Sequence, residues 1–319
     1  MDFGKSTRAT VPLRRRIMLL YSFVLRLLEC AKYIMFVTSI EMHKTGKTLL
    51  VLIIGLPALR QWKKIRWKDR PELYDLMYSL RWGDAVTNNY GFAPAETDEP
   101  ERFQLQLYAE LIKLLAASSG ELVAKGVLEI SCGRGGGFRH LIGLLPVQPH
   151  AIGLDFSINA IRYCTHRYKE HPNVAFVCGH ALRLPFRDMS FDVVVNVEAS
   201  HAYRDDSAFL REVSRVLVRG GKFLYADYRR RYNVPTLERL ARDTGFSGTF
   251  HDITANVVAA CRLDAGRRQA LIRAAVPWYY RVLANERLKR YAAIPGTLNF
   301  ERFQGGDRLY FMTCLTRLR

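Results

Sequence analysis

The sequence predicts an α/β protein with a doubly wound, mostly parallel sheet of seven strands and an apolar helical extension at its N-terminus. Three observations lead to this fold class. Short apolar runs recur between residues 127 and 226 and alternate with stretches of helical periodicity, as in successive βαβ units. A glycine cluster separates the first run from the first helix. Residues 1–70 carry 15 Lys and Arg against 4 Asp and Glu among long apolar runs, which sets them apart from the rest.

The N-terminal 70 residues combine apolar runs with basic clusters. Residues 17–40 are apolar apart from Arg26, Glu29 and Lys32, whose spacing of three places them on one side of a helix. Because charges at the middle of a lipid-facing span are costly, a helix lying in the membrane interface fits better than one crossing the bilayer. We predict that residues 1–70 associate with a membrane, with a mitochondrial targeting sequence or a helical cap on the next domain as alternatives.

Residues 71–319 form the predicted second domain. Helices are expected over its first part, residues 71–120, where Phe103 to Ser119 has a clear amphipathic pattern. Residues 254–300 are expected to form a helical insertion before a final strand over 309–315.

The centre of this domain is the stretch from Gly126 to Asp155, which has the pattern of a strand, a glycine turn, a helix and a second strand. Four glycines between residues 133 and 137 let the backbone approach a ligand closely, and Asp155, about 20 residues beyond, can bind both hydroxyls of a ribose. Glu129, just before the first strand ends, is unsuited to a pyrophosphate and suits an ammonium or sulfonium group. A dinucleotide-binding turn and a purely structural glycine loop are the alternatives.

The alternation of strands and helices continues along the chain. Further strands are predicted over 174–177, 191–197, 222–226 and 248–253, with a turn at Gly220–Gly221. Helices are predicted over 158–169, 206–218, 235–244 and 254–288. Ser157 is placed to cap the first of these helices.

The pattern E-x-x-C-G-x-G-G-G, from Glu129 to Gly137, resembles motif I of the class I S-adenosylmethionine-dependent methyltransferases. Further features fall where that family has them: Asp155, Gly179–His180–Ala181, Leu184–Val194 and Leu217–Phe223. The resemblance covers roughly residues 100–230 and the closing strand near residue 310. It implies a Rossmann-like fold whose last strand is antiparallel, with S-adenosyl-L-methionine as cofactor.

A narrower resemblance comes from three stretches: Asn196–Tyr203, Phe223–Asp227 and Asp252–Val258. They look like the phthiotriolone/phenolphthiotriolone dimycocerosates methyltransferase subgroup, whose members O-methylate a hydroxyl on a long lipid. In addition, Asn88–Phe92 is similar to the aromatic lid motif of small-molecule methyltransferases, which implies that residues 71–120 act as a lid.

The resemblance also implies roles for individual residues. The methionine half of the cofactor is expected to bind Glu129, Ser131, Gly133 and Gly135, with Tyr90 closing over it. Asp155 would hold the ribose. The adenine would lie among Phe156, His180, Ala181 and Leu182. His180 departs from the family, which usually has an acid there that accepts a hydrogen bond from the adenine amine; a neutral imidazole nitrogen or a backbone carbonyl can accept it instead.

The end of the strand over 191–197 is expected to face the reacting centre, with Asn196 contacting the cofactor and Glu198 in a catalytic role. His201 lies just beyond and is the candidate general base, because an imidazole can take an alcohol proton as the oxygen attacks. Tyr203 could orient the substrate or His201. The alternatives are a helix-capping role for His201 and a packing role for Tyr90 and Tyr203.

The formal net charge is +18, of which +11 lies in residues 1–70. Because this charge sits beside apolar runs, it favours a membrane surface over nucleic acid as partner. The chain also has Asn196–Val197–Glu198–Ala199 where nucleic-acid methyltransferases carry an Asn-Pro-Pro-Tyr type tetrapeptide. The six cysteines include no C-x-x-C pair, and no His/Cys cluster suggests a metal, which predicts reduced thiols on the cytoplasmic side or in a mitochondrion.

The sequence therefore predicts a membrane-associated enzyme that methylates a hydroxyl of a hydrophobic small molecule or lipid. Two alternatives stay open. The acceptor could be a carbon atom of a quinone, a tocopherol precursor or an isoprenoid or sterol. The chain could also be an inactive methyltransferase-like scaffold, which the His180 departure would favour.

Overall fold

The computed structural model describes residues 74, 78, 82–119, 124–275 and 278–318. The membrane-association segment predicted over residues 1–70 lies outside this range, as does Cys30. Within the described residues, none of the helices combines the length and the apolar character that a membrane span requires.

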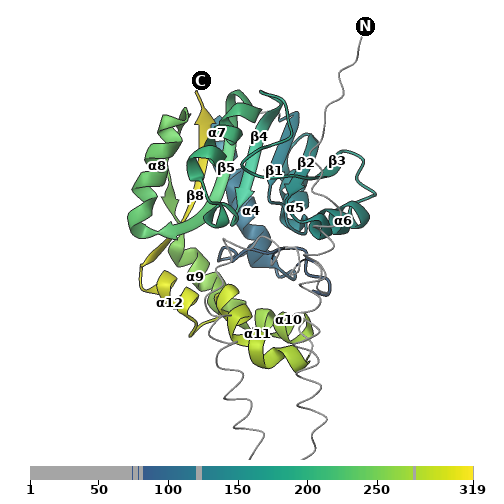
Figure 1. Cartoon of the computed structure of the whole chain (residues 1–319), viewed down its shortest axis with the longest axis vertical. Coiled ribbons are helices and arrows are strands. Elements are labelled where there is room, and N and C mark those ends of the chain that lie inside the picture. The colour runs from purple at the N-terminus through teal and green to yellow at the C-terminus, as the bar shows by residue number, and fades with distance from the viewer. Residues whose placement is uncertain (1–73, 75–77, 79–81, 120–123, 276–277, 319) are drawn as a thin grey trace, which may run out of the picture. The chain divides into compact units, whose positions relative to one another are not determined.

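An open, mostly parallel sheet forms the centre of the described domain (Figure 1). Five parallel strands follow the order β3-β2-β1-β4-β5, and β8 lies antiparallel beside β5 with β6 and β7 paired to it. The strands are β1 Gly126–Ile130, β2 His150–Asp155, β3 Val174–Cys178, β4 Phe191–Val197, β5 Leu217–Arg230, β6 Phe246–Ser247, β7 His251–Asp252 and β8 Arg308–Arg317. The predicted Rossmann-like fold and its antiparallel last strand are confirmed.

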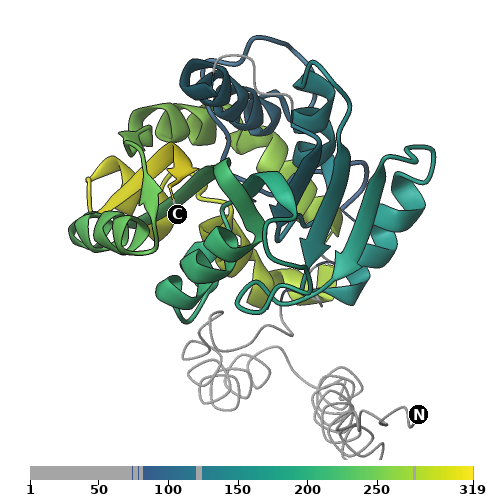
Figure 2. The same cartoon turned by 90° about the horizontal axis from the view of Figure 1, so that it is seen from above.

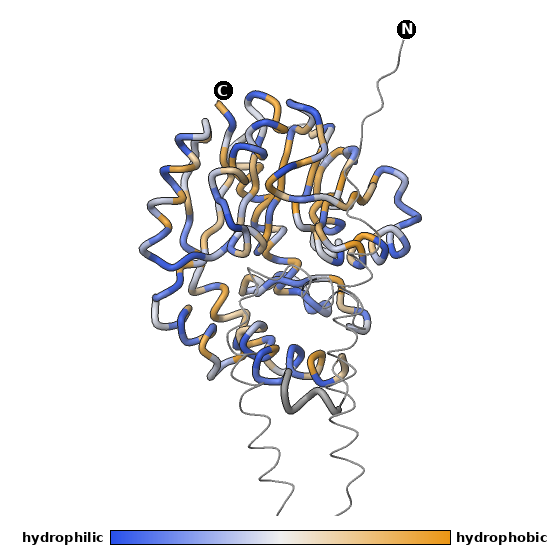
Figure 3. The backbone as a smooth tube through the Cα atoms, in the orientation of Figure 1, coloured by the Kyte–Doolittle hydropathy of each residue, from blue (hydrophilic) through white to orange (hydrophobic). Residues whose placement is uncertain are grey.

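Helices cover both faces of the sheet (Figures 1 and 2). On one face, α4 (Arg102–Ser119) and α5 (Gly136–Leu144) pack on Val127, Val193 and Val195. On the other, α7 (Asp206–Val216) and α8 (Val234–Asp243) pack on the alternate residues, such as Leu128 and Val194. A strand buried on both faces reads as a continuous apolar run, and Figure 3 shows hydrophobic residues concentrated along these central strands.

The predicted helix over 158–169 is α6 (Ile158–Arg167), and the Ser157 hydroxyl accepts the backbone N–H of Ala160 at its first turn. Strand β5 is longer than the prediction over 222–226. The expected Gly220–Gly221 turn is an irregularity inside this strand: pairing with β4 passes from Phe191–Leu217 to Val193–Lys222, and Gly220 takes a positive φ of 76° between them. The single strand predicted over 248–253 is instead two short strands, β6 and β7, so the sheet has eight strands among the described residues.

The single helix predicted over 254–288 is also wrong. Three helices occupy the region: α9 Thr254–Leu263, α10 Ala265–Ala275 and α11 Trp278–Tyr291, followed by α12 Leu298–Gln304. The break between α9 and α10 falls at Asp264, whose carboxylate accepts hydrogen bonds from Gln104, Arg267 and Arg268. These helices lie beyond the carboxyl ends of the parallel strands (Figure 1).

The strand order reverses direction at β1, which lies between β2 and β4. In doubly wound sheets, ligands bind in the crevice outside the carboxyl ends of the strands at this switch point. The turn after β1, the acid at the end of β2 and the residues after β4 therefore meet at one edge.

Candidate active site

The turn after β1 depends on backbone conformations that favour glycine. Gly133 and Gly135 have φ values of 56° and 74°, and Ser131 adopts 63°, although it carries a side chain. Asp155 holds this turn: its carboxylate accepts the N–H of Gly133 at 2.9 Å and the N–H of Ser157 at 2.8 Å.

Glu129 lies beneath the turn and is 1% exposed. One carboxyl oxygen accepts the Tyr108 hydroxyl at 2.8 Å, whereas Oε2 is buried and has no hydrogen-bond partner in the part of the chain that the structure describes. Burial raises the pKa of Glu129 to about 8, although the bond from Tyr108 alone lowers it. A buried carboxyl group with one vacant oxygen is suited to receive a cation.

Asn196, at the end of β4, is also buried and incompletely bonded. Its amide nitrogen donates to the Ile130 carbonyl at 2.8 Å and to the Tyr203 hydroxyl at 3.2 Å, while Oδ1 has no partner within the described ranges. The Tyr203 hydroxyl also lies 2.6 Å from that of Ser131. Tyr203 therefore joins the turn after β1 to the end of β4.

Phe156 and His180 stand at the ends of β2 and β3. Phe156 is 49% exposed, and its ring lies edge-on to that of His180, with 5.9 Å between the ring centroids. The Ala181 side chain is buried in the core beneath α7, whereas Leu182 is partly buried there. This arrangement leaves an exposed aromatic face beside the Asp155 carboxylate.

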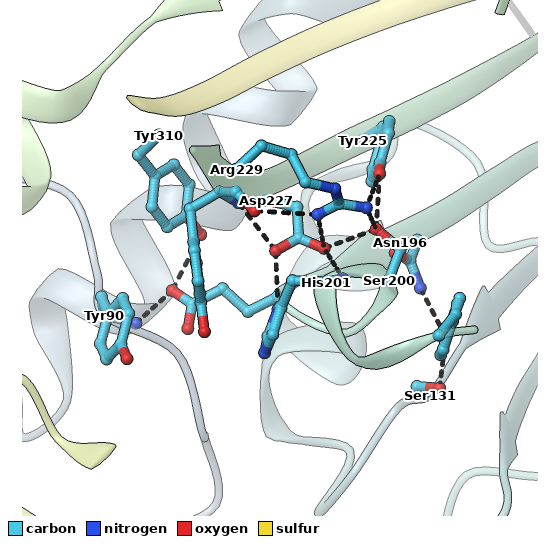
Figure 4. Close-up of polar contacts among 12 residues, drawn as sticks. Tyr90, Ser131, Asn196, Ser200, His201, Tyr225, Asp227, Arg229 and Tyr310 are labelled. Atoms are coloured by element: carbon cyan, nitrogen blue, oxygen red, sulfur yellow. Dashed lines mark hydrogen bonds and ion pairs between the residues drawn. The ribbon is translucent and has the colours of Figure 1, made fainter. Parts of the chain in front are cut away.

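The short 3-10 helix Ser200–Ala202 follows β4 and places His201 against the end of β5 (Figure 4). His201 Nδ1 lies 2.8 Å from Asp227 Oδ1, and its backbone N–H donates to Asp227 Oδ2 at 2.8 Å. The imidazole stacks on Tyr228, with 4.2 Å between ring centroids. Because an ionised Asp227 can only accept, Nδ1 carries the proton and Nε2 has its lone pair available.

Asp227 is completely buried and sits in a network of donors. Ser200 Oγ donates to Oδ2 at 2.5 Å, and Arg229 lies 3.3 Å from the same oxygen. Burial alone would raise the pKa of Asp227, but its interactions with His201 and Arg229 and its hydrogen bonds hold the pKa below its usual value. Asp206 is the second acid bonded to Arg229, at 3.0 Å. Asp227 is therefore ionised in the folded protein at neutral pH.

Glu198 connects β4 to the segment before α4. Its carboxylate accepts the backbone N–H of Tyr90 and the hydroxyl of Tyr310, the latter at 2.8 Å (Figure 4). Glu198 has a positive φ of 47°, which for a residue with a side chain is strained and typical of functional sites. Burial raises the pKa of Glu198 to about 8, against the effect of these two bonds.

A cavity runs past these groups. Tyr90, Glu198 and His201 line it on the sheet side, while the C-terminal helices contribute apolar and polar side chains to its opposite wall. That wall includes Leu271, Ile272, Leu288, Tyr291, Arg267 and Arg268. Trp82, Asn88 and Arg134 are among the residues that complete the lining.

Comparison with known proteins assigns the family. Residues 128–225 match a family described as "Methyltransferase domain". The chain is 36% identical over 222 residues to the phthiotriol/phenolphthiotriol dimycocerosates methyltransferase of Mycobacterium tuberculosis, covering 69% of this chain and 78% of that protein. It therefore belongs to this subgroup of the class I S-adenosylmethionine-dependent methyltransferases.

Two further similarities agree with this assignment. The fatty-acid O-methyltransferase of Mycolicibacterium smegmatis is 39% identical over 175 residues, which cover 51% of this chain and 60% of that relative's length. The solved structure of the geranyl diphosphate C-methyltransferase from Streptomyces coelicolor superimposes with a TM-score of 0.55 at 16% identity, covering 77% of this chain and 98% of that one. The latter likeness concerns the fold alone.

S-adenosylmethionine is the cofactor of this methyltransferase, and the residues at the switch point fit it. Glu129 Oε2, which has no hydrogen-bond partner among the described residues, can receive its ammonium group, and the Asp155 carboxylate at the turn is the group expected to hold the ribose. Exposed Phe156 provides a face for the adenine. At Gly133 a Cβ would lie 2.8 Å from the Tyr78 hydroxyl, so the glycine is what lets that side chain lie against the turn. The individual ligand contacts stay predictions.

The geometry alters three predicted roles in this methyltransferase. His180 Nδ1 accepts the N–H of Leu182 at 3.1 Å, so the neutral ring carries its proton on Nε2 and can only donate toward adenine. A backbone carbonyl, the alternative given by the sequence, is then the predicted acceptor for the adenine amine. Ala181 can contribute only its backbone, because its side chain is buried in the core. Tyr203 orients Ser131 and Asn196 rather than His201.

Sequence reasoning missed Asp227 and Arg229 as functional residues. The pairing of β4 with β5 could have identified Asp227. Val197 of β4 pairs with Ala226 of β5, so the residues that follow them lie at the same edge of the sheet. An acid there is within reach of any base in the loop after β4. Tyr90 lines the cavity and also packs in the core against Phe303; its closing over the cofactor or substrate stays a prediction.

Proposed function

We propose that this methyltransferase acts on a hydroxyl group of a hydrophobic small molecule or lipid, and that it works at a membrane surface. The observation that carries the hydroxyl assignment is the 2.8 Å contact between His201 Nδ1 and the ionised Asp227 at the wall of the cavity. An alcohol must lose its proton as it attacks a methyl group, and a base with a free nitrogen meets that need.

The proton transfer would run through His201. Its Nε2 takes the hydroxyl proton, and Asp227 stabilises the imidazolium that forms while holding the ring through Nδ1. S-adenosylmethionine, held by Glu129, the glycine turn and Asp155, supplies a methyl group on a positively charged sulfur. The cavity walls position the acceptor oxygen and exclude water, which is most of what an in-line displacement requires of a protein. Glu198, protonated below about pH 8, contributes by holding Tyr90 at the wall.

The hydrophobic acceptor is supported by the cavity and by the relatives. The cavity wall opposite His201 has an apolar part, which includes Leu271, Ile272 and Leu288. Trp82 adds an aromatic surface. The curated relatives are named for fatty acids and for phthiotriol dimycocerosates, both of which are lipids. A long apolar acceptor with one polar end that reaches His201 fits these features.

Membrane association is supported by the composition of residues 1–70, with 15 basic and 4 acidic residues among apolar runs. A cytoplasmic-side active site is supported by the cysteines, since the five in the described residues are all free thiols. Membrane attachment is tested by sedimentation with membranes after carbonate washing, comparing the full chain with one lacking residues 1–60. We expect the full chain to pellet and the shortened chain to stay in solution; equal solubility would contradict the attachment.

The chemical assignment is tested by following labelled methyl groups. The full chain is incubated with methyl-labelled S-adenosylmethionine and a lipid extract, and the labelled products are then saponified. A methyl ether keeps its label under this treatment, whereas a methyl ester releases labelled methanol. We expect a stable ether. Release as methanol would reassign the acceptor as a carboxylate, and label on a carbon atom would reject transfer to oxygen altogether.

A further inference from the structure

Arg134 lies inside the glycine turn and is 7% exposed, which is unusual for an arginine. Its Nε donates to the Ala85 carbonyl at 2.7 Å, and its guanidinium carbon lies 3.8 Å from the centroid of the Tyr163 ring. These two contacts fix the plane of the guanidinium. The side chain also lines the cavity that His201 and Glu198 share.

No carboxylate in the described residues forms an ion pair with Arg134, and this separates it from the other buried arginines. Arg229 pairs with Asp227 and Asp206, and Arg268 pairs with Asp264. A buried guanidinium that lacks a counter-ion is costly, so such groups normally meet an anion. The terminal nitrogens of Arg134 have no hydrogen-bond partner among the described residues, and they present a fork that matches a carboxylate.

Glu129 shows the opposite deficiency at the same turn. It is a buried acid with one oxygen unpaired, five residues before Arg134. A ligand that satisfies both groups carries a cation and an anion close together, as the ammonium and carboxylate of an α-amino acid do. We propose that Arg134 is a carboxylate-binding residue that holds the α-carboxylate of the methyl donor while Glu129 holds its ammonium group.

A carboxylate could also come from the acceptor, because Arg134 lines the shared cavity and one relative is named for fatty acids. The pairing with Glu129 favours the donor, since an acceptor carboxylate would leave Glu129 unsatisfied. This inference rests on the donor site of the family and not on the hydroxyl assignment, so the two can fail separately.

The test is calorimetric titration of the full chain and of Arg134→Met with two ligands. One ligand is S-adenosylhomocysteine, and the other is its decarboxylated analogue, which keeps the amine but lacks the carboxylate. We expect the substitution to weaken S-adenosylhomocysteine roughly 10- to 100-fold, as for the loss of a charge-assisted bidentate contact. The analogue should bind wild type and variant with the same affinity.

Two further variants act as controls. Arg134→Lys keeps the charge without the fork and should give an intermediate loss of S-adenosylhomocysteine affinity. Arg167→Met removes an exposed arginine that also lies over a tyrosine, Tyr168, and should leave both affinities unchanged. Equal binding of the analogue by wild type and Arg134→Met also demonstrates that the variant is folded.

Three outcomes would overturn the assignment. Equal S-adenosylhomocysteine affinity in wild type and Arg134→Met would remove Arg134 from the donor site. A parallel loss for both ligands would indicate a structural role for the side chain. An unchanged donor affinity with a raised KM for a fatty acid, but not for a long-chain alcohol, would move the carboxylate to the acceptor. A wild type that binds neither ligand would instead contradict the cofactor itself.

Discussion

The two halves of the site differ in how completely their polar groups are bonded. At the donor half, Glu129 Oε2 and Asn196 Oδ1 are buried without partners among the described residues, and Arg134 lacks an acid there. At the acceptor half, around the ends of β4 and β5, Asp227 and Arg229 are paired within the protein.

This difference indicates two ways of preparing a site. The donor half leaves places for charged groups that arrive with the cofactor, so binding there should depend strongly on single charges and on pH. The acceptor half is organised before any ligand binds, because His201 already has its tautomer and orientation set by Asp227. Substitutions in the donor half should therefore change the affinity for the cofactor, and substitutions in the acceptor half should change kcat.

The largest effect is expected for His201→Ala. Loss of the base should lower kcat by about 10²- to 10⁴-fold, as is typical for a general base, while the affinity for S-adenosylhomocysteine stays nearly the same. Methyl transfer to a long-chain alcohol and calorimetry measure the two quantities. His251→Ala removes an exposed histidine on β7 and is the matched control. A retained kcat would remove His201 from the mechanism.

Asp227→Asn should produce the next largest loss. It removes the acceptor that sets the His201 tautomer, so kcat should fall by about 10²-fold or more, and the double variant with His201→Ala should be no slower than His201→Ala alone. The change also leaves Arg229 with one acid, Asp206, and should lower the free energy of unfolding by up to about 3–5 kcal/mol. Asp206→Asn removes the more exposed partner of Arg229 and should keep kcat close to wild type. Additive losses of kcat in the double variant would contradict the claim that Asp227 acts through His201.

Glu129→Gln should weaken S-adenosylhomocysteine about tenfold, because it replaces the charge that receives the ammonium group. The pKa of about 8 gives a second signature. Glu129 is protonated below that pH in the free protein, so binding should release up to about one proton per site and tighten as pH rises from 6 to 8. Titrations in buffers of different ionisation enthalpy measure this release. Glu129→Gln should abolish the proton release. A wild type that releases no proton would contradict the assignment of Glu129 as the residue that binds the ammonium group.

Glu198→Gln should have the smallest effect at neutral pH. Because burial raises its folded pKa to about 8, Glu198 is already uncharged at pH 7, and an amide can accept the same bonds from Tyr90 and Tyr310. In the unfolded chain the acid ionises near its ordinary pKa, so wild type loses stability as pH rises from about 4.5 to 8, whereas the variant does not. In thermal unfolding, the stability of Glu198→Gln relative to wild type should therefore increase as the pH rises across that range. A relative stability that falls with rising pH would contradict the raised pKa of Glu198.

Local patterns were sufficient for the donor half. The buried strands, the Ser157 cap and the glycine turn with Asp155 all depend on residues within about 30 positions of one another, and the family motif covers them. The cavity wall opposite His201 depends on pairings that span far more of the chain than the 26 positions between His201 and Asp227. Arg268 donates to the Tyr90 carbonyl across 178 positions, and no local periodicity predicts such a contact.

The C-terminal helices show the same limit. Residues 254–288 have helical propensity throughout, and a continuous helix was the natural expectation. The chain breaks at Asp264 because its carboxylate is drawn into bonds with Gln104 of α4 and with two arginines of α10. Tertiary bonding decides the break, and it turns Leu271 and Ile272 into a wall of the cavity.

A crystal structure of the full chain with S-adenosylhomocysteine and a long-chain alcohol would test the account most directly. The account predicts the ammonium group at Glu129, the carboxylate at Arg134, and the alcohol oxygen within hydrogen-bond distance of His201 Nε2. An alcohol oxygen bound away from His201, or an amino-acid end turned away from Glu129, would contradict it.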